Sequence, residues 1–283
     1  MAIFGATAEL PRHWLETYQR PEAANVALLE AALRGDAARC LAALNAGACP
    51  NYYGGDGGTT SVHVAAALGD VSALRAICDH VSDDAALVAL LDVESTVLKA
   101  RPLHFAAAAG STACVEFLLR RGAAVDAPNA YGHTPLMLAC SRNHGGTVRA
   151  LVSAGAQACA RSSKGETPLH MAVAGVAAAA RAVRTDGNAH APGDLVRVIE
   201  ALLREPRIDA NALDGHGATA LHCVAQMQLD DAVACAVAKL LFQKKANCKL
   251  RDESGKRPSD YLVTKKSSTA LLALLRQREL LVV

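Results

Sequence analysis

A seven-residue pattern that returns at a fixed spacing constrains the fold of this chain more than any other feature. Three clear copies begin at Arg101, Thr134 and Thr167, so each starts 33 residues after the one before it. Two further copies flank these three. A motif and a period that agree independently indicate a tandem array, in which each short unit buries its apolar face against its neighbours. In chain order the copies are Thr60–Ala66, Arg101–Ala107, Thr134–Cys140, Thr167–Val173 and Thr219–Ala225.

Weaker copies extend the array at both ends. Val26–Asp36 keeps the Ala-Ala and Gly-Asp pairs of the stronger copies, and Gly255–Tyr261 aligns with their opening. Ser268–Arg276 then supplies a second helix for the last unit. We therefore expect about seven helix-turn-helix units, with atypical first and last units because a capping unit needs a polar outer face. The repeat domain is expected to cover residues 25–283, after an N-terminal extension of residues 1–24.

The third copy shows how the residues build one unit. Pro102 suits the first turn of a helix, where its missing N–H costs nothing. Gly110 is a good C-terminal signal for that helix. A second helix is expected from Thr112 to Arg120, and residues 123–129 then form an extended finger that leads to the next copy. Helices this short are not stable alone, so they must pack on neighbouring units.

The period and the motif, which reads Thr-Pro-Leu-His at Thr167, resemble the ankyrin repeat. The resemblance implies an all-α solenoid that binds other proteins. It also implies that a partner lies on the concave face, formed by the finger tips and the exposed side of each first helix. In this family the motif histidine hydrogen-bonds the backbone of the neighbouring repeat. The histidines at that position are His63, His104, His170 and His222.

Two stretches break the period. About eight extra residues lie near residues 82–100, and about nineteen lie near residues 176–193. We expect the second insertion to prolong the first helix of the fifth unit and to continue as a polar loop. A helix from Asp194 to Arg204 should follow it. Insertions in solenoids map to loops, often at a binding or regulatory edge.

Composition favours the same architecture. Hydrophobic residues make up 52% of the chain but aromatic residues only 4%, so the core must use small side chains. Closely packed helices meet this condition better than a β-sandwich does. The net charge of +2 argues neither for nor against nucleic acid. Its distribution is uneven, because residues 239–283 hold eleven Lys/Arg and four Asp/Glu, a net +7, whereas residues 1–238 carry a net −5.

Cysteine usage and targeting signals indicate an intracellular protein, cytoplasmic or nuclear. The nine cysteines show no Cys-x-x-Cys spacing, and most lie in alanine-rich helical stretches. A reduced thiol behaves there as a small hydrophobic group. Residues 1–10 do not have the pattern of a signal peptide, and no apolar run reaches the ~20 residues that span a bilayer.

No motif nominates an enzyme, a cofactor or a metal site. The motif histidines stand about one unit apart, which is too far for shared metal ligation. Gly215–Ala220 fits a relaxed dinucleotide fingerprint, but it lies in a finger rather than between a strand and a helix. A basic segment is suited to phosphate or nucleic acid by charge, although it has almost no aromatic residues for stacking on bases. Its residues are Lys244, Lys245, Lys249, Arg251, Lys256 and Arg257.

The resemblance also gives the positions where a partner is expected. Tyr, Arg and Met are residue types that interface cores favour. We therefore expect a protein-interaction adaptor or scaffold that binds through Tyr52, Tyr53, Tyr131, His133, Arg142, Lys164, Glu166, His216, Gln226 and Met227. Leu68, Val97, Leu98 and Ala218 are expected on the same face.

Two other functions fit the same residues. One is a structural subunit of a large cytoskeletal or ribonucleoprotein assembly, anchored by the long insertion and the basic end. The other is a sensor that binds a phosphorylated small molecule or RNA through the basic end. The salt dependence of binding separates the phosphate hypothesis from the others, because released counterions weaken such binding as salt rises.

Overall fold

Helices follow one another in pairs along the chain. The computed structural model describes residues 22–54, 58–186, 192–227, 229–263 and 269–281. Within these ranges the protein is all-helical and has no β-strand, only an isolated bridge between Gly54 and Thr59. The pairs are α2 (Glu22–Leu33) with α3 (Ala37–Asn45), α4 (Ser61–Leu68) with α5 (Val71–His80), α7 (Pro102–Ala109) with α8 (Thr112–Arg120), α9 (Pro135–Ser141) with α10 (Gly145–Ser153), α11 (Pro168–Asp186) with α12 (Pro192–Leu203), α13 (Ala220–Gln226) with α14 (Asp231–Gln243), and the 3-10 helix η1 (Pro258–Tyr261) with α15 (Thr269–Leu281).

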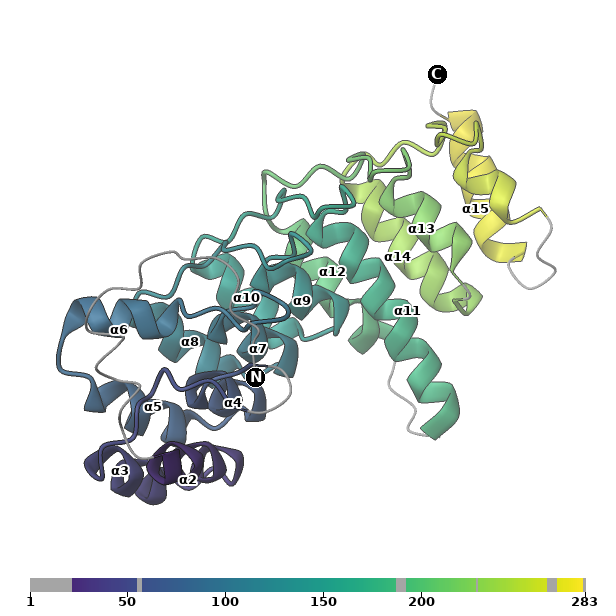
Figure 1. Cartoon of the computed structure of the whole chain (residues 1–283). Helices are drawn as coiled ribbons and strands as arrows, with labels where there is room; N and C mark the ends of the chain where they lie inside the picture. Colours follow the sequence, from purple (N-terminus) through teal and green to yellow (C-terminus); the bar gives the residue numbers. More distant parts are fainter. Residues whose placement is uncertain (1–21, 55–57, 187–191, 228, 264–268, 282–283) are drawn as a thin grey trace, which may run out of the picture.

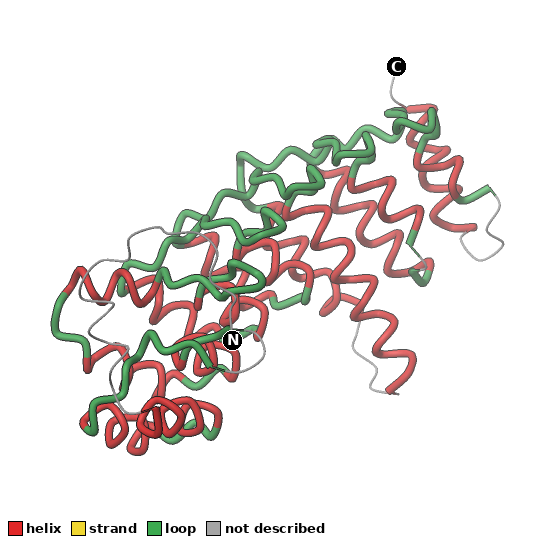
Figure 2. Tube along the Cα trace, in the orientation of Figure 1, coloured by secondary structure: helices red, strands yellow, loops and turns green. Residues whose placement is uncertain are grey.

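The pairs stack side by side from α2 at one end to α15 at the other (Figure 1). We call the first helices α4, α7, α9, α11 and α13 row A, and each of them contacts the next. The second helices α3, α5, α8, α10, α12 and α14 form row B in the same way. The extended fingers between pairs lie together along one edge of the stack (Figure 2). The arrangement gives one continuous surface made of finger tips and the exposed side of row A.

Local signals set where the row A helices end. α7 is followed by Gly110, whose φ of 75° is a left-handed conformation that glycine adopts without strain. After α9 the corresponding turn uses Asn143, with a φ of 59°. Asparagine visits this region more readily than other non-glycine residues, so the turn is kept without glycine.

The core combines small side chains in row A with branched side chains in row B. Ala65, Ala106 and Ala172 of row A are fully buried. Leu74 and Leu118 of row B are also fully buried. Because alanine takes little space, neighbouring row A helices approach closely, and the leucines fill the space behind them. This is the small-residue core that the composition predicted.

The insertion near residues 82–100 contains a helix that the sequence did not lead us to expect. This helix, α6 (Asp84–Leu91), lies between α5 and the next finger. Arg101 at the start of α7 lies 3.4 Å from Asp92 and 3.7 Å from Glu94, so partly exposed ion pairs link the end of the insertion to row A. The buried side chains of α6 are Leu87, Leu90 and Leu91.

The prolonged first helix predicted for the second insertion is present. α11 runs to Asp186 and extends past the ends of its row A neighbours (Figure 1). Residues 187–191, part of the predicted polar loop, lie outside the described residues. α12 then begins at Pro192 rather than at Asp194, since proline is favoured in the first turn of a helix. At the other end α2 begins at Glu22, inside the expected extension of residues 1–24.

Candidate protein-binding surface

Backbone hydrogen bonds join the tips of neighbouring fingers. In each bond an N–H of one finger donates to a carbonyl oxygen of the finger before it, with N···O distances from 2.7 to 3.1 Å. These bonds hold the tips at a fixed spacing, and they use backbone groups that a partner strand would otherwise pair with. The donors and acceptors are Thr96 to Gly58, Ala130 to Leu98, Ser163 to Tyr131, Gly215 to Lys164, and Glu253 to His216.

A short polar side chain fixes the turn inside four of the fingers. Asn129 Oδ1 accepts hydrogen bonds from the N–H groups of Tyr131 (2.9 Å) and His133 (3.0 Å). Such bonds stabilise turns by replacing backbone partners. The tip side chains are therefore carried on hydrogen-bonded loops. The residues that do the same in later fingers are Ser162, Asp214 and Asp252.

The motif histidines tie row A to the fingers. Burial lowers the pKa of His63 and His104 to about 4, so both rings are neutral at pH 7. Each motif Nε2 lies 3.0 Å from a carbonyl oxygen of the next finger, which confirms the structural role that the resemblance implied. The pairs are His63 with Ala100, His104 with His133, His170 with Ala218, and His222 with Lys256. In α9 the position is taken by Met137, which is fully buried.

Aromatic side chains stand on the fingers. The Tyr131 side chain is 58% exposed, and its ring centroid lies 5.9 Å from that of His133. Tyr53 is 38% exposed, and its hydroxyl donates to the Glu94 carbonyl oxygen at 3.2 Å. Tyr52 is half-buried. The Tyr131 and Tyr53 rings thus offer apolar area on loops that are already positioned.

Polar residues of the expected contact set are mostly exposed. Arg142 follows α9 and Gln226 ends α13, and both are exposed. Lys164 and His216 are exposed at the tips of the next two fingers. Met227 is half-buried and packs against the core, so less of its side chain is available to a partner than its position suggested.

The structure corrects the expectation for Ala218, which is only 5% exposed. The residue directly precedes Thr219, where the extended finger turns into the helix, and its side chain faces inward. Glu166, at the equivalent place in the finger before, is half-buried, and its Oε2 lies 3.3 Å from Ser162 Oγ. This carboxylate contributes to the shape of its own finger as well as to the surface.

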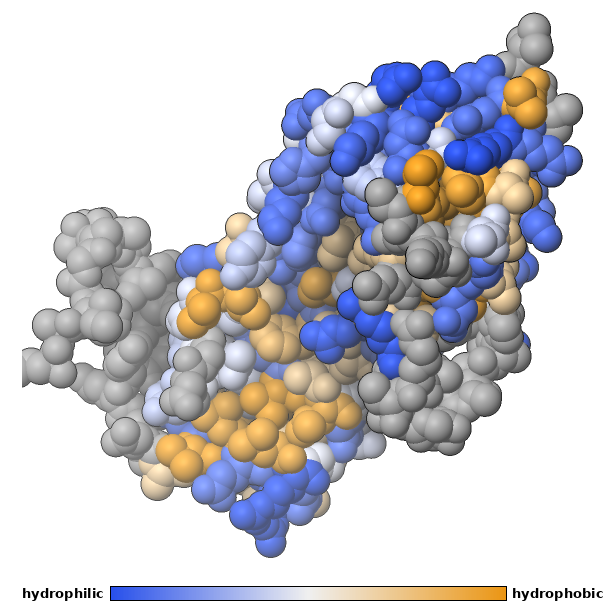
Figure 3. Space-filling view, turned by 90° about the vertical axis from the view of Figure 1, so that its right-hand side faces the viewer, coloured by the Kyte–Doolittle hydropathy of each residue, from blue (hydrophilic) through white to orange (hydrophobic). Residues whose placement is uncertain are grey.

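Half-buried apolar side chains follow the motif position in row A and were not predicted as site residues. Val64, Phe105 and Leu138 occupy this place on α4, α7 and α9. The repeat position directly after the motif histidine would have identified them. Figure 3 shows that hydrophobic residues gather low on the face it draws, at the height of α4 and α7 in Figure 1. Nearby exposed apolar residues are Leu68 (54%), Val97 (65%) and Leu98 (39%).

Comparison with known families agrees with this architecture. A family model described as "Ankyrin repeats (3 copies)" matches residues 84–162 and 103–188. The matched region contains the contact of His104 with the His133 carbonyl oxygen, the finger bonds donated by Ala130 and Ser163, and the exposed Tyr131. The chain is an ankyrin-repeat protein. Ankyrin repeats are generally protein–protein interaction modules.

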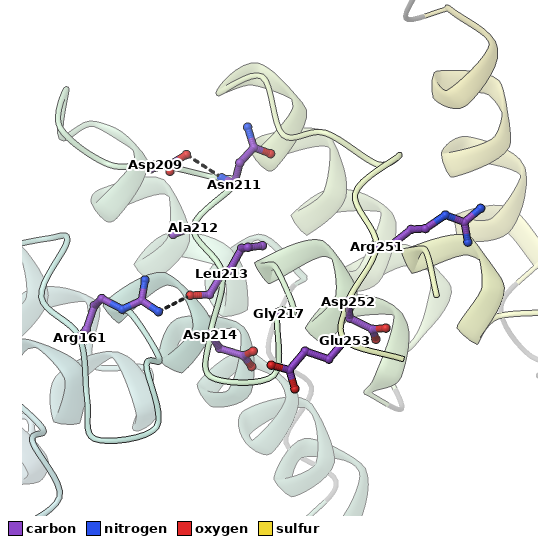
Figure 4. Close-up of a pocket in the computed structure, with 10 residues that line it drawn as sticks. All are labelled: Arg161, Asp209, Asn211, Ala212, Leu213, Asp214, Gly217, Arg251, Asp252 and Glu253. Carbon is purple, nitrogen blue, oxygen red and sulfur yellow. Dashed lines mark hydrogen bonds between the residues drawn. The ribbon is translucent and has the colours of Figure 1, made fainter. Parts of the chain in front are cut away.

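An open hollow of about 740 Å³ lies on the finger layer of this ankyrin-repeat protein, between the fingers that follow α10, α12 and α14. Figure 4 shows the carboxylates of Asp214 and Glu253 pointing toward the same space. Arg161 donates to the Leu213 carbonyl oxygen at 2.7 Å, and Arg251 points away from these carboxylates (Figure 4). The sequence did not predict the hollow, because residues of separate fingers line it.

His170, Asp214 and Cys223 are a described group whose potential ligand atoms lie within 4.8 Å of one another. His170 Nδ1 accepts from the Thr167 N–H, and Nε2 then donates to the Ala218 carbonyl oxygen, so neither ring nitrogen keeps a free lone pair. Burial raises the pKa of Cys223 to about 12, which disfavours the thiolate that a metal needs. The histidine contacts match those of the other repeats, so we assign the group a structural role.

Several basic residues expected near the C-terminal end contact the protein itself. Lys256 Nζ lies 5.1 Å from the centre of the Tyr261 ring, and Lys244 Nζ lies 3.4 Å from the Glu205 carbonyl oxygen. Lys245 and Lys249 are exposed. Arg251 contacts the Gly255 carbonyl oxygen, and Arg257 lies 4.0 Å from Glu279.

The thiols of the protein form no disulfide bonds. All nine cysteines lie in the described part of the chain, and none is bonded to another. Burial raises the pKa of Cys78 to about 12 and raises that of Cys114, so both stay protonated at neutral pH. Among the described helices, none is long and apolar enough to cross a membrane.

Proposed function

We propose that this ankyrin-repeat protein is a non-catalytic adaptor or scaffold that binds another protein on the concave face of its stack. The observation that carries the proposal is the exposed Tyr131 side chain, on a finger whose backbone is held by Asn129 and by the next finger. An aromatic side chain on a preformed loop buries a large area at a small cost in conformational entropy.

The proposed contact set combines the finger tips with the ends of the row A helices. Aromatic residues, arginine and methionine dominate the energetics of protein interfaces, and the surrounding polar residues help to exclude water. The set is Tyr52, Tyr53, Tyr131, His133, Arg142, Lys164, Glu166, His216, Gln226 and Met227.

Site-specific photo-crosslinking tests this proposal. A photoreactive residue at position 131 is expected to trap a partner from extracts of the native source, which mass spectrometry then identifies. The control position is Leu41, which is 41% exposed on α3 in row B. Capture of the same protein equally at both positions, or of none at 131, would contradict binding at this face.

We also propose that the array has seven units, with α2–α3 and η1–α15 as caps. The last unit supports this, because a short 3-10 helix replaces the usual first helix. Ser259 Oγ donates to Glu279 Oε1 at 2.7 Å, which ties η1 to α15. Arg276, Gln277 and Arg278 of α15 are exposed, which gives this unit the polar outer face that a cap requires.

The two rival functions are separated by simple measurements. For the phosphate or RNA sensor, affinity should fall steeply between low and moderate salt. We favour a solvated cap, because Lys256 and Arg257 contact Tyr261 and Glu279. For the assembly subunit, the protein should elute from native extracts at the size of a large particle rather than as a free chain.

A further inference from the structure

The part of the row A face built by α4, α7 and α9 is apolar. Phe105 and Leu138 are half-buried on α7 and α9, and Leu68 is 54% exposed at the end of α4. Val97 (65%) and Tyr131 (58%) border them from the fingers. Exposed apolar groups gathered in one region are typical of an interaction site. Beyond α9 the finger tips change character, and the exposed side chains there include Lys164, His216 and Glu253.

The fully exposed charges of the apolar part have one sign, although the chain from residue 1 to 238 has a net charge of −5. At the described finger tips and on the row A face of α4, α7 and α9, the charged side chains classed as exposed are those of Lys99 and Arg142, both cationic. The acidic side chains of the same fingers are half-buried and engaged within the protein. Asp92 and Glu94 pair with Arg101 at 3.4 and 3.7 Å, and Asp126 accepts from the Gln157 N–H at 2.9 Å. A partner that matches this surface therefore has apolar side chains flanked by carboxylates.

The backbone of the fingers argues against a partner that binds as an added strand. The Ala130 N–H donates to the Leu98 carbonyl oxygen at 2.8 Å, and the Ser163 N–H donates to that of Tyr131 at 3.0 Å. The Tyr131 N–H is also used, by Asn129 Oδ1 at 2.9 Å. A partner segment that lies on the face of α4, α7 and α9 must therefore form its backbone hydrogen bonds within itself. An α-helix does this and an extended peptide does not.

We propose that the surface formed by α4, α7, α9 and their fingers binds an amphipathic α-helix of the partner protein, with apolar residues on its contact face and Asp or Glu on its flanks. This inference rests on the proposed function and names the chemistry of the partner. The apolar face of the helix lies on Phe105, Leu138 and Leu68, with Tyr131 beside it. Lys99 and Arg142 pair with the acidic flanks.

The dimensions fit a helix of moderate length. Packed helices lie about 8–10 Å apart, so the axes of the three neighbours α4, α7 and α9 span a surface about 16–20 Å long, which we call the floor. At about 1.5 Å per residue, a helix of roughly 11–13 residues spans that floor. Such a helix presents about three apolar residues at i, i+3 or i+4 and i+7 to the floor.

A peptide selection tests the proposal with the full chain as bait. The probe is a displayed library of random peptides about 16 residues long, slightly longer than the estimated floor. We expect the enriched peptides to show apolar residues at helical spacing with acidic flanks, and to become helical when they bind. Enrichment of basic peptides, of alternating apolar patterns, or of nothing above background overturns the proposal.

A charge exchange then locates the site. The variant Lys99→Glu with Arg142→Glu should weaken an enriched acidic peptide more than tenfold, and a copy of the peptide with lysine flanks should regain affinity for that variant. The control variant, Arg149→Glu with Lys239→Glu, makes the same change in charge at exposed positions of α10 and α14 in row B. It should weaken binding less than threefold. Equal losses in the two variants contradict the proposed site.

The experiments distinguish a failure of this inference from a failure of the proposed function. If position 131 crosslinks a partner whose contacting segment is neither helical nor acidic, this inference fails and the proposed function stands. Unchanged melting temperatures of both charge variants show that a lost affinity does not come from unfolding.

Discussion

Gly175 of α11 lies against the backbone of α9, so that a Cβ atom on it would stand 2.2 Å from the carbonyl oxygen of Cys140. The same atom would stand 2.9 Å from the Ser141 carbonyl carbon. The residue is buried within the prolonged helix. At the equivalent position α4 and α7 have their last residue, and α9 and α13 have already ended. The absence of a side chain therefore lets α11 cross α9 closely and continue to Asp186.

The variant Gly175→Ala should destabilise the protein. Alanine raises helix propensity by about 1 kcal/mol, but overlap with a rigid backbone carbonyl costs about 1–3 kcal/mol or more, so the overlap prevails. Urea unfolding measures the difference. Gly145→Ala in α10 is the matched control, because its Cβ would meet nothing closer than 3.7 Å. Gly145→Ala should leave the free energy of unfolding unchanged or increase it. A Gly175→Ala protein as stable as this control would contradict the close contact.

Met137 interrupts the series of histidine contacts, and Met137→His should restore it. In the neighbouring repeats the histidine bonds the carbonyl oxygen of the residue before the next helix-capping residue, which here is Glu166. One more buried hydrogen bond of this kind adds about 1 kcal/mol of stability. Thermal unfolding of Met137→His is expected to shift upward, while His104→Met should shift it downward. A lower melting temperature for Met137→His would show that the thioether packing matters more than the missing bond.

The buried histidines predict loss of stability in acid. Burial lowers the pKa of His63 and His104 to about 4 in the folded state, whereas an unfolded histidine titrates near pH 6.5. Between these values the unfolded state binds more protons than the folded state, so stability falls as pH decreases from about 6.5 toward about 4. Above about pH 6.5 this contribution is fully present.

Urea midpoints measured across this pH range test the effect. Glutamine carries an amide N–H donor at about the position of Nε2 and does not titrate, so the double variant His63→Gln with His104→Gln should depend less on pH than the parent protein does. The exposed His80 serves as the control, and His80→Gln should keep the parent's pH profile. An unchanged profile in the double variant would contradict the assignment to these two histidines.

The repeated part of the fold could be predicted, because its signals are local and recur. Pro102 and Gly110 bound α7 as expected, since a proline at the first turn and a left-handed glycine act within a few residues. The length of the insertion near residues 82–100 was predicted, but α6 was not. This helix depends on the tertiary burial of Leu87 and Leu90, and the repeat pattern does not predict that contact.

The surface was predictable only where repeat position decides it. Ala218 was placed on the surface, yet its side chain turns inward where the finger enters the helix. The hollow between fingers could not be predicted, because Asp214 and Glu253 lie far apart in sequence and meet only when the fingers stack. The close approach at Gly175 could not be predicted either, since it depends on how α11 and α9 cross.

The last prediction concerns the proposed interface. The double variant Tyr131→Ala with Arg142→Ala should weaken the crosslinked partner more than tenfold, because exposed aromatic and arginine side chains carry much of the energy of interfaces. Both side chains are exposed, so the free energy of unfolding should change by less than about 1 kcal/mol. Calorimetric titration and urea unfolding measure the two quantities on the same samples. Arg149→Ala on row B is the control and should bind as the parent does. An unchanged affinity of the double variant would place the partner elsewhere on the protein, while a large loss of stability would show that Tyr131 supports the finger rather than the interface.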